Sequence, residues 1–140
     1  MKRLISNSAI LAILLSMIAV SCEDDYSTRI PKFDGVTLNP DKCIPGKEIE
    51  LTLNVKDKGE HVYIYDTKIT IVNDDNPKDQ KPFTIPKGEF SLSNPTYKFL
   101  APDSSGTYTV SVQAKVSFSA GDVLYPSTQP PVQTAKLTVY

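Results

Sequence analysis

The sequence predicts an all-β protein, an antiparallel β-sandwich of seven to eight strands. From residue 34 onward, apolar residues alternate with polar ones at period two, and turn-forming residues interrupt them at short intervals. No segment shows a helical period. Alternation of this kind is typical of strands that turn one face to a core and the other to water.

The first predicted strands lie between residues 35 and 56. Residues 35–39 form a short strand that ends at Pro40-Asp41, and Pro45-Gly46 makes the next turn. Residues 48–56 follow as a half-buried strand. Its predicted inward residues are Ile49, Leu51, Leu53 and Val55.

Residues 61–72 predict a longer strand, rich in β-branched and aromatic side chains. One face is expected to carry Tyr63, Tyr65, Thr67, Ile69 and Ile71. Residues 73–81 are a loop by composition, because Asn, Asp and Pro favour turns over ladders. A short strand over 82–85 is expected at a sheet edge because prolines flank it.

The C-terminal half contains the clearest strand. A short strand is predicted over residues 90–92. Tyr97 and Phe99 share a face before Pro102. Residues 107–119 alternate without interruption and predict a central strand. A turn at 120–122, a return strand at 123–125, an interruption at 126–131 and a last strand then follow. Inward positions are Tyr108, Val110, Val112, Ala114, Val116 and Phe118 in the central strand, and Ala135, Leu137 and Val139 in the last.

Two stretches resemble immunoglobulin-like domains. The run from Ser104 to Val110 resembles the turn into strand F, with Tyr108 in the place of the tyrosine corner. The run from Pro45 to Leu51 is similar to the A–B region of bacterial Ig-like and PKD-like modules. The resemblance implies an immunoglobulin-like fold, but the chain has no Trp and lacks the inter-sheet disulfide of antibody domains.

The N-terminus predicts export. Lys2 and Arg3 precede an apolar run over residues 9–20, which is shorter than the ~20 residues a spanning helix needs. Ala19-Val20-Ser21-Cys22 resembles a bacterial lipobox, which implies cleavage before Cys22 and membrane attachment through a lipid on that cysteine. The alternative is an ordinary secreted protein in which Cys22 is buried or disulfide-bonded.

Residues 1–21 are thus expected to be a signal peptide, 22–33 a lipidated cysteine with a flexible tether, and 34–140 the sandwich. Glu23, Asp24 and Asp25 resemble the surface-export signal of Bacteroidetes-type lipoproteins, which implies a lipid-anchored protein on the outer face of the outer membrane. A soluble spacer is the alternative for this acidic run.

Net charge excludes one class of partner. The formal net charge is −1, and loss of Lys2 and Arg3 with the signal makes it −3. A nucleic-acid partner is therefore not expected.

Some side chains suggest ligand contacts. Tyr63, Tyr65 and Tyr125 could stack on a sugar or pack against a protein. Asp74, Asp75 and Asp79 offer oxygen ligands that suit Ca²⁺, although they lack the order of an EF-hand, and no metal is assigned. No cofactor is expected.

Routes to catalysis are few. Cys43 and His61 could in principle form a nucleophile pair, and Glu48 and Glu50 lie two apart on one strand face. No phosphate loop or nucleophile elbow accompanies them. The sequence predicts a non-catalytic binding or adhesion module for a glycan or protein, acting through loops 73–81 and 126–133. The alternative is an accessory or structural subunit of a surface complex, joined through exposed edge strands.

Overall fold

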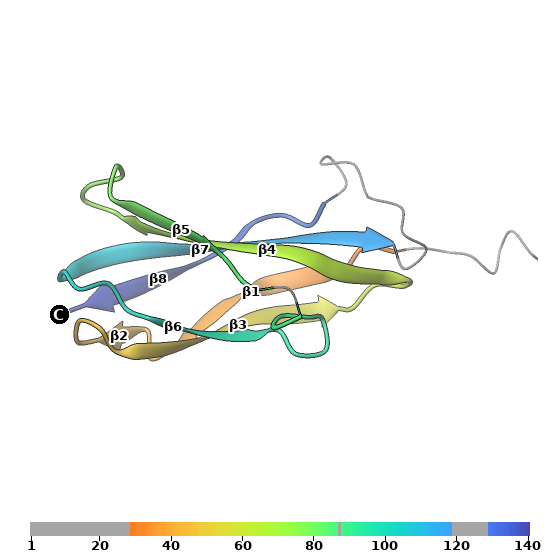
Figure 1. Ribbon diagram of the computed structural model, residues 1–140, viewed down its shortest axis with the longest axis horizontal. Coiled ribbons are helices and arrows are strands. Elements are labelled where there is room, and N and C mark those ends of the chain that lie inside the picture. The colour runs from red at the N-terminus through yellow and green to blue at the C-terminus, as the bar shows by residue number, and fades with distance from the viewer. Residues whose placement is uncertain (1–28, 87, 119–128) are drawn as a thin grey trace, which may run out of the picture.

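The computed structural model describes residues 29–86, 88–118 and 129–140. These residues form eight strands and no helix, stacked in two layers (Figure 1). None of them forms a helix long and apolar enough to cross a membrane. The strands are β1 (Lys32–Asn39), β2 (Lys42–Cys43), β3 (Glu48–Asp57), β4 (Val62–Asn73), β5 (Gln80–Thr84), β6 (Thr96–Leu100), β7 (Gly106–Phe118) and β8 (Gln133–Val139).

The strand order is that of an immunoglobulin-like sandwich. One sheet has the order β1-β3-β6 and the other β2-β8-β7-β4-β5. β1, β3 and β6 take the places of A, B and E, whereas β8, β7, β4 and β5 take those of G, F, C and C′. All neighbours are antiparallel except the short β2, which runs parallel to β8. The predicted fold class is confirmed.

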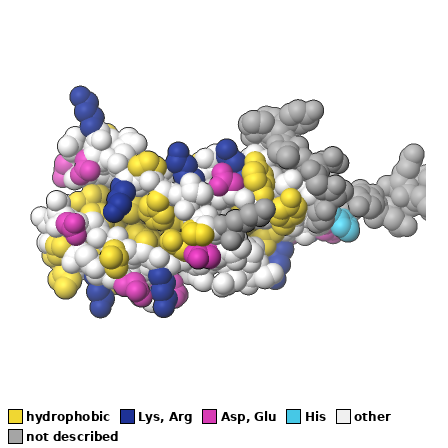
Figure 2. All heavy atoms as spheres, viewed as in Figure 1, with side chains coloured by type: hydrophobic (Ala, Val, Ile, Leu, Met, Phe, Trp, Pro, Cys, Tyr) yellow, Lys and Arg dark blue, Asp and Glu magenta, His cyan; other side chains and the backbone are white. Residues whose placement is uncertain are grey.

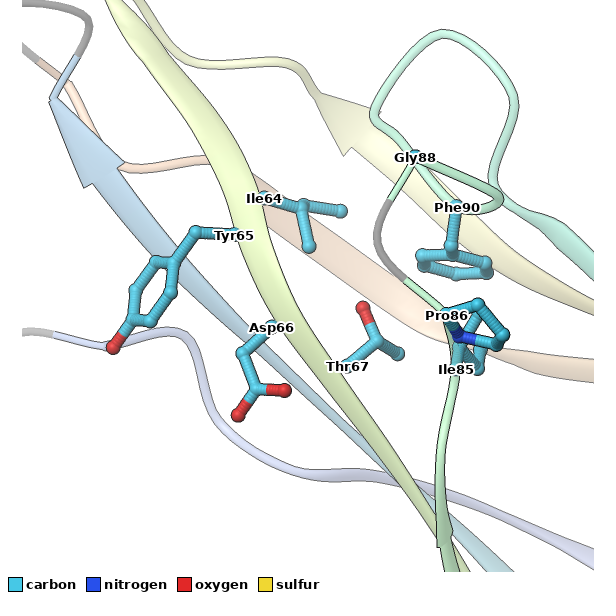
Figure 3. Close-up of a pocket in the computed structure, with 8 residues that line it drawn as sticks. All are labelled: Ile64, Tyr65, Asp66, Thr67, Ile85, Pro86, Gly88 and Phe90. Carbon is cyan, nitrogen blue, oxygen red and sulfur yellow. The ribbon is translucent and has the colours of Figure 1, made fainter.

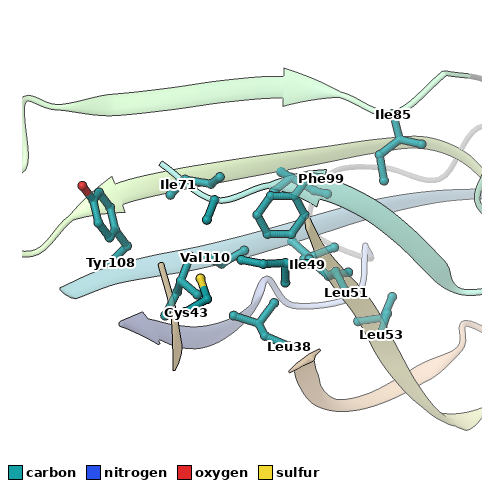
Figure 4. Close-up of a cluster of buried hydrophobic side chains, with 14 of the residues drawn as sticks. Leu38, Cys43, Ile49, Leu51, Leu53, Ile71, Ile85, Phe99, Tyr108 and Val110 are labelled. Carbon is teal, nitrogen blue, oxygen red and sulfur yellow. The ribbon is translucent and has the colours of Figure 1, made fainter. Parts of the chain in front are cut away.

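The core lies between the sheets and follows the predicted alternation. Figure 4 shows side chains from both layers pointing into the space between them. On β3, Ile49 and Leu51 are 0% exposed, and on β7 Val110 and Val116 are equally buried. Burial of such side chains supplies most of the driving force for folding.

The tyrosine corner is present. The Tyr108 hydroxyl donates a hydrogen bond to the Ser104 carbonyl oxygen over 2.7 Å. Its side chain is buried, and this burial, followed by the nearby charge of Asp79, raises the pKa of the phenol. The hydroxyl therefore remains a protonated donor at neutral pH and ties the loop before β7 to the strand.

Tyr108→Phe is expected to lower the free energy of unfolding by about 1 kcal/mol, because it removes this hydrogen bond while keeping the ring buried. Urea denaturation would measure the change. Tyr97→Phe is the matched control. Tyr97 is half-buried and its ring packs against Phe83, but its hydroxyl makes no hydrogen bond with the described residues. Equal stability changes in the two variants would contradict a structural role for the corner.

Several element predictions need correction. Residues 90–92 form no strand, because turns closed by Glu89 N–H to Pro86 O and by Ser91 with Asn94 shape this segment instead. The first strand begins at Lys32 rather than at residue 35, and β2 was not predicted. The turn at 120–122 and the strand at 123–125 lie outside the described residues.

A β-bulge changes the faces of β4. Ile64 pairs with Val116 and Asp66 with Lys115, so Tyr65 is an extra residue in the ladder. Ile64 consequently packs against the core, whereas Tyr63 and Tyr65 are exposed, 44% and 36% respectively. The expectation that both tyrosines share a face with Thr67 was wrong, because alternation cannot reveal an inserted residue.

The two ends of the sandwich carry different features. At the proximal end, where the chain enters the domain, Arg29 forms a β-bridge with Glu60. At the distal end, Asn73 pairs with Tyr108, and Gly106 pairs with Val139. The 13 residues of β7 connect the two ends, a distance of roughly 40 Å at about 3.3 Å per residue.

Ion pairs fix the proximal end. The Arg29 guanidinium donates to Asp57 Oδ1 and to Glu60 Oε1, each over 2.9 Å. The hydrogen bond from Arg29, joined by one from the Gly59 N–H, holds the pKa of the Asp57 carboxyl below its usual value. Pro31, which follows, is fully buried. The domain therefore includes residues that the sequence assigns to the tether.

Candidate binding surface

An apolar groove lies on the open side of the sandwich, between the edge strands β5 and β6. Its volume is about 290 Å³. Figure 2 shows hydrophobic side chains gathered on this face between the two sheets. The lining residues are Ile71, Lys81, Phe83, Tyr97, Lys98, Phe99 and Leu100.

Three aromatic rings form the floor of this groove. Phe83 of β5 lies 6.2 Å from Tyr97 and 6.1 Å from Phe99, measured between ring centroids, and both contacts are tilted. The strands belong to different sheets, so these rings close the gap between them. Leu100 is 65% exposed at the rim. A concave apolar surface with an exposed rim is typical of binding sites.

The edge of β6 has free backbone groups. At its two ends, Leu53 N–H bonds to Pro95 O and Ala101 N–H bonds to Lys47 O. Because alternate residues of an antiparallel pair face the partner strand, Tyr97 and Phe99 bond to β3, whereas Thr96, Lys98 and Leu100 direct their N–H and C=O groups outward. No described strand pairs with this edge.

The facing edge of β5 is protected. Ile85 N–H bonds to Thr67 O and Asn73 N–H to Asp79 O, so the same alternation directs the backbone of Pro82 outward. Proline has no N–H to offer to an added strand. The prediction that this strand lies at an edge is confirmed.

The groove has a basic rim. Lys81 and Lys98 both line it and both are exposed. Lys98 Nζ lies 3.8 Å from Glu48 Oε1. Exposed ion pairs of this kind contribute little to the free energy of unfolding. An adjoining hollow of about 190 Å³ contains Asp79 and Asp103 beside Lys81.

The structure does not bring the predicted contact tyrosines to this groove. Tyr63 pairs with Ser117 near the proximal end, whereas Ile71 of the groove pairs with Val110 toward the distal end. Figure 3 shows the Tyr65 ring pointing away from a small hollow under Ile85 and Phe90. That hollow, of about 20 Å³, has room for little more than one water molecule. Tyr125 lies outside the described residues.

The described parts of the two predicted binding loops do not lie together, and residues 126–128 are outside the described residues. Loop 73–81 is distal. Gln129 and the residues after it are proximal or central, since the Gln129 side chain bonds to Val116 N–H and C=O. The described parts of the two loops therefore do not form one distal surface.

The three loop aspartates do not gather into one cluster in the described part of the chain. Across residues 29–86, 88–118 and 129–140, no three His, Cys, Asp or Glu side chains gather to hold an ion. Asp74 instead accepts hydrogen bonds from Thr109 Oγ1 over 2.6 Å and from Lys136 Nζ over 2.8 Å. The Lys136 bond, followed by the Thr109 bond, lowers the pKa of the Asp74 carboxyl. Asp74 thus joins its loop to β7 and β8.

The candidate nucleophile pair, Cys43 and His61, is also separated. Cys43 pairs with Val139 at the distal end, whereas His61 precedes Val62 at the proximal end. Burial raises the pKa of the Cys43 thiol, although Lys47 opposes this, so the reactive thiolate is disfavoured. Glu48 and Glu50 are both exposed on β3.

The groove was not predicted, although the sequence contains part of its signal. The shared face of Tyr97 and Phe99 and the edge position of residues 82–85 were both evident. The aromatic residues of β5 and β6 meet because the segment between these strands forms turns. A strand in that segment would cover them.

Comparisons with known proteins add a likeness of fold. No protein-family model and no curated protein matches the chain. Among solved structures, the chain is similar to the CARDB domain of the PF1109 protein from Pyrococcus furiosus, which was solved in complex with di-metal ions. Sequence identity is 19% and the TM-score 0.40, over 81% of this chain and 97% of that one. The immunoglobulin-like assignment therefore rests on this chain's own strand order and tyrosine corner.

Proposed function

We propose that the protein is a non-catalytic binding module of the bacterial cell envelope, anchored by a lipid on Cys22, that takes a protein ligand in the groove between β5 and β6. The observation that carries this proposal is the aromatic floor of Phe83, Tyr97 and Phe99 beside an open strand edge. Aromatic side chains are enriched where proteins bind one another.

The position of the groove agrees with such an anchor. Arg29 comes seven residues after Cys22, a reach of at most about 25 Å. An anchor at Cys22 would therefore keep the proximal end, with Tyr63, near the membrane. The groove, on the side of the domain and with Ile71 toward the distal end, would lie farther from the membrane than Tyr63. With Glu23, Asp24 and Asp25 acting in export, the groove would be exposed to the cell exterior.

A second candidate function is that of an accessory or structural subunit of an outer-membrane or surface complex. The outward backbone groups of β6 favour it, because an exposed edge can add a strand from a permanent partner. A lasting stoichiometric complex would distinguish this role from transient adhesion.

The anchor is tested by Cys22→Ser. We expect the variant to leave the membrane fraction, because more than one acyl chain on Cys22 would supply the attachment. Fractionation followed by immunoblotting measures this, with Cys43→Ser as control. Unchanged membrane association of the Cys22 variant would contradict lipid anchoring.

The binding site is tested by photo-crosslinking in the native cells. A photoreactive phenylalanine at Leu100, which is 65% exposed, is expected to give a protein adduct of defined mass. The matched control places it at Val132, an apolar residue that is 48% exposed on the other sheet's outer side. No adduct from position 100, or identical adducts from both positions, would contradict the proposed surface. If position 100 instead crosslinked to a labelled glycan, the groove would bind sugar and not protein.

A further inference from the structure

We propose that the free edge of β6 accepts an extended segment of a partner protein as an added strand, with an acidic residue opposite Lys98 and apolar side chains in the groove. This inference rests on the proposed binding function and specifies the chemistry of the ligand. Three observations support it: the backbone pattern of β6, the alternation of its side chains, and the charge at its centre.

The backbone of β6 offers a complete set of hydrogen-bonding groups. Thr96, Lys98 and Leu100 each direct one N–H and one C=O away from β3. In immunoglobulin constant domains strand D pairs with strand E at this edge. Among the described residues no strand takes that place. An antiparallel segment opposite Thr96, Lys98 and Leu100 could bond to all of these groups.

The side chains of β6 determine what such a segment must carry. Phe99 is buried and Tyr97 half-buried on the groove side, whereas Lys98 and Leu100 are exposed. Directly opposite residues of an antiparallel pair share a face. Partner residues opposite Tyr97 and Phe99 would therefore enter the groove, and its volume of about 290 Å³ suits apolar side chains.

Charge selects the residue opposite Lys98. A carboxylate there would lie on the same outer face as Lys98. It would add to the exposed contacts that Lys98 already has on β3, with Glu48 at 3.8 Å and with Glu50 in the directly opposite position. A second copy of the chain fits less well. In the antiparallel register with greatest overlap, two β6 edges would place Lys98 directly opposite Lys98, and like charges in that position are destabilising. The partner is accordingly a different protein.

Only one edge of the groove is open to pairing. Pro82, at the centre of the β5 edge, removes the N–H that an added strand would need there. The same substitution can be used on β6. Lys98→Pro removes one outward N–H and leaves the bonds of Tyr97 and Phe99 to β3 in place.

The test uses a synthetic heptapeptide of sequence Ser-Thr-Val-Glu-Val-Thr-Ser, capped at both ends, with the full-length chain labelled with ¹⁵N. Its pattern reads the same in both directions, so it needs no assumption about strand polarity. At millimolar peptide, we expect NMR shifts and slowed exchange at the outward amides of Thr96, Lys98 and Leu100. The amides of Gln80 and Thr84, on the β5 edge, should not change.

Charge and edge are tested separately. A peptide with Lys in place of Glu should bind about fivefold more weakly at low salt. Lys98→Glu should reverse this preference, and Lys98→Thr should remove it while keeping the amide shifts. Lys98→Pro should abolish binding, with the folded state checked by its unfolding transition.

Other results would overturn strand addition. These are no shifts with either peptide, shifts confined to the groove side chains without the outward amides, or undiminished binding by a folded Lys98→Pro variant. If the Leu100 crosslink still formed in any of these cases, the protein would bind a partner at this face by another mode. Failure of the inference is thereby distinguishable from failure of the proposed function.

Discussion

Leu51→Ala is expected to lower the free energy of unfolding by about 2–5 kcal/mol, through lost burial and the cavity left behind. Leu51 is 0% exposed on β3, the central strand of its sheet. It pairs with Leu38 of β1 on one side and with Tyr97 of β6 on the other. In Figure 4 it points into the space between the sheets. Because the paired strands on both sides of Leu51 are held by backbone hydrogen bonds, neighbouring side chains can fill little of the cavity that the substitution leaves.

Urea denaturation at neutral pH measures this effect. Glu50→Ala is the matched control, because Glu50 is exposed on the opposite face of the same strand and its loss should change stability by no more than about 0.5 kcal/mol. Similar changes in the two variants would contradict the assigned faces of β3. Since Leu51 stands opposite Tyr97, the Leu51 variant should also disturb the groove.

Regular alternation made much of this core predictable. On β3 and β7 the residues expected to face inward are buried or half-buried, because a strand without insertions carries its pattern along its whole length. The Tyr108 corner was predictable too, since its bond to Ser104 spans only four residues.

The candidate surface was less predictable because it depends on irregularities and on distant contacts. The bulge at Tyr65 turned two predicted contact residues outward at the proximal end. The groove formed because Phe83 of one sheet meets Tyr97 and Phe99 of the other. A strand period describes which residues share a face, but it does not indicate which edges of two sheets lie together.

Gly59 illustrates the same limit. The sequence predicts a turn at Lys58-Gly59, and the φ angle of Gly59 is +74°. The sequence does not indicate that a segment some 30 residues earlier lies against that turn. A Cβ at Gly59 would overlap the Arg29 carbonyl oxygen and lie 2.9 Å from both Pro31 N and Val62 Cγ2.

Gly59→Ala is therefore expected to destabilise the protein by about 3 kcal/mol, combining left-handed backbone strain with steric overlap. Gly46→Ala is the matched control: Gly46 also has a φ of +74°, but nothing lies within 4 Å of its Cβ position. That variant should lose only the strain of the left-handed backbone, about 1–2 kcal/mol. Urea denaturation compares the two variants.

The difference between the two variants measures how firmly the start of the domain is held. Arg29 N–H bonds to Glu60 O over 3.1 Å and Glu60 N–H to Arg29 O over 2.9 Å, and both bonds should lose hydrogen-exchange protection in Gly59→Ala. If Gly59→Ala instead matched Gly46→Ala in stability, the segment around Arg29 would be able to move aside freely. The expected excess cost implies that the segment around Arg29 and the turn at Gly59 are held firmly together.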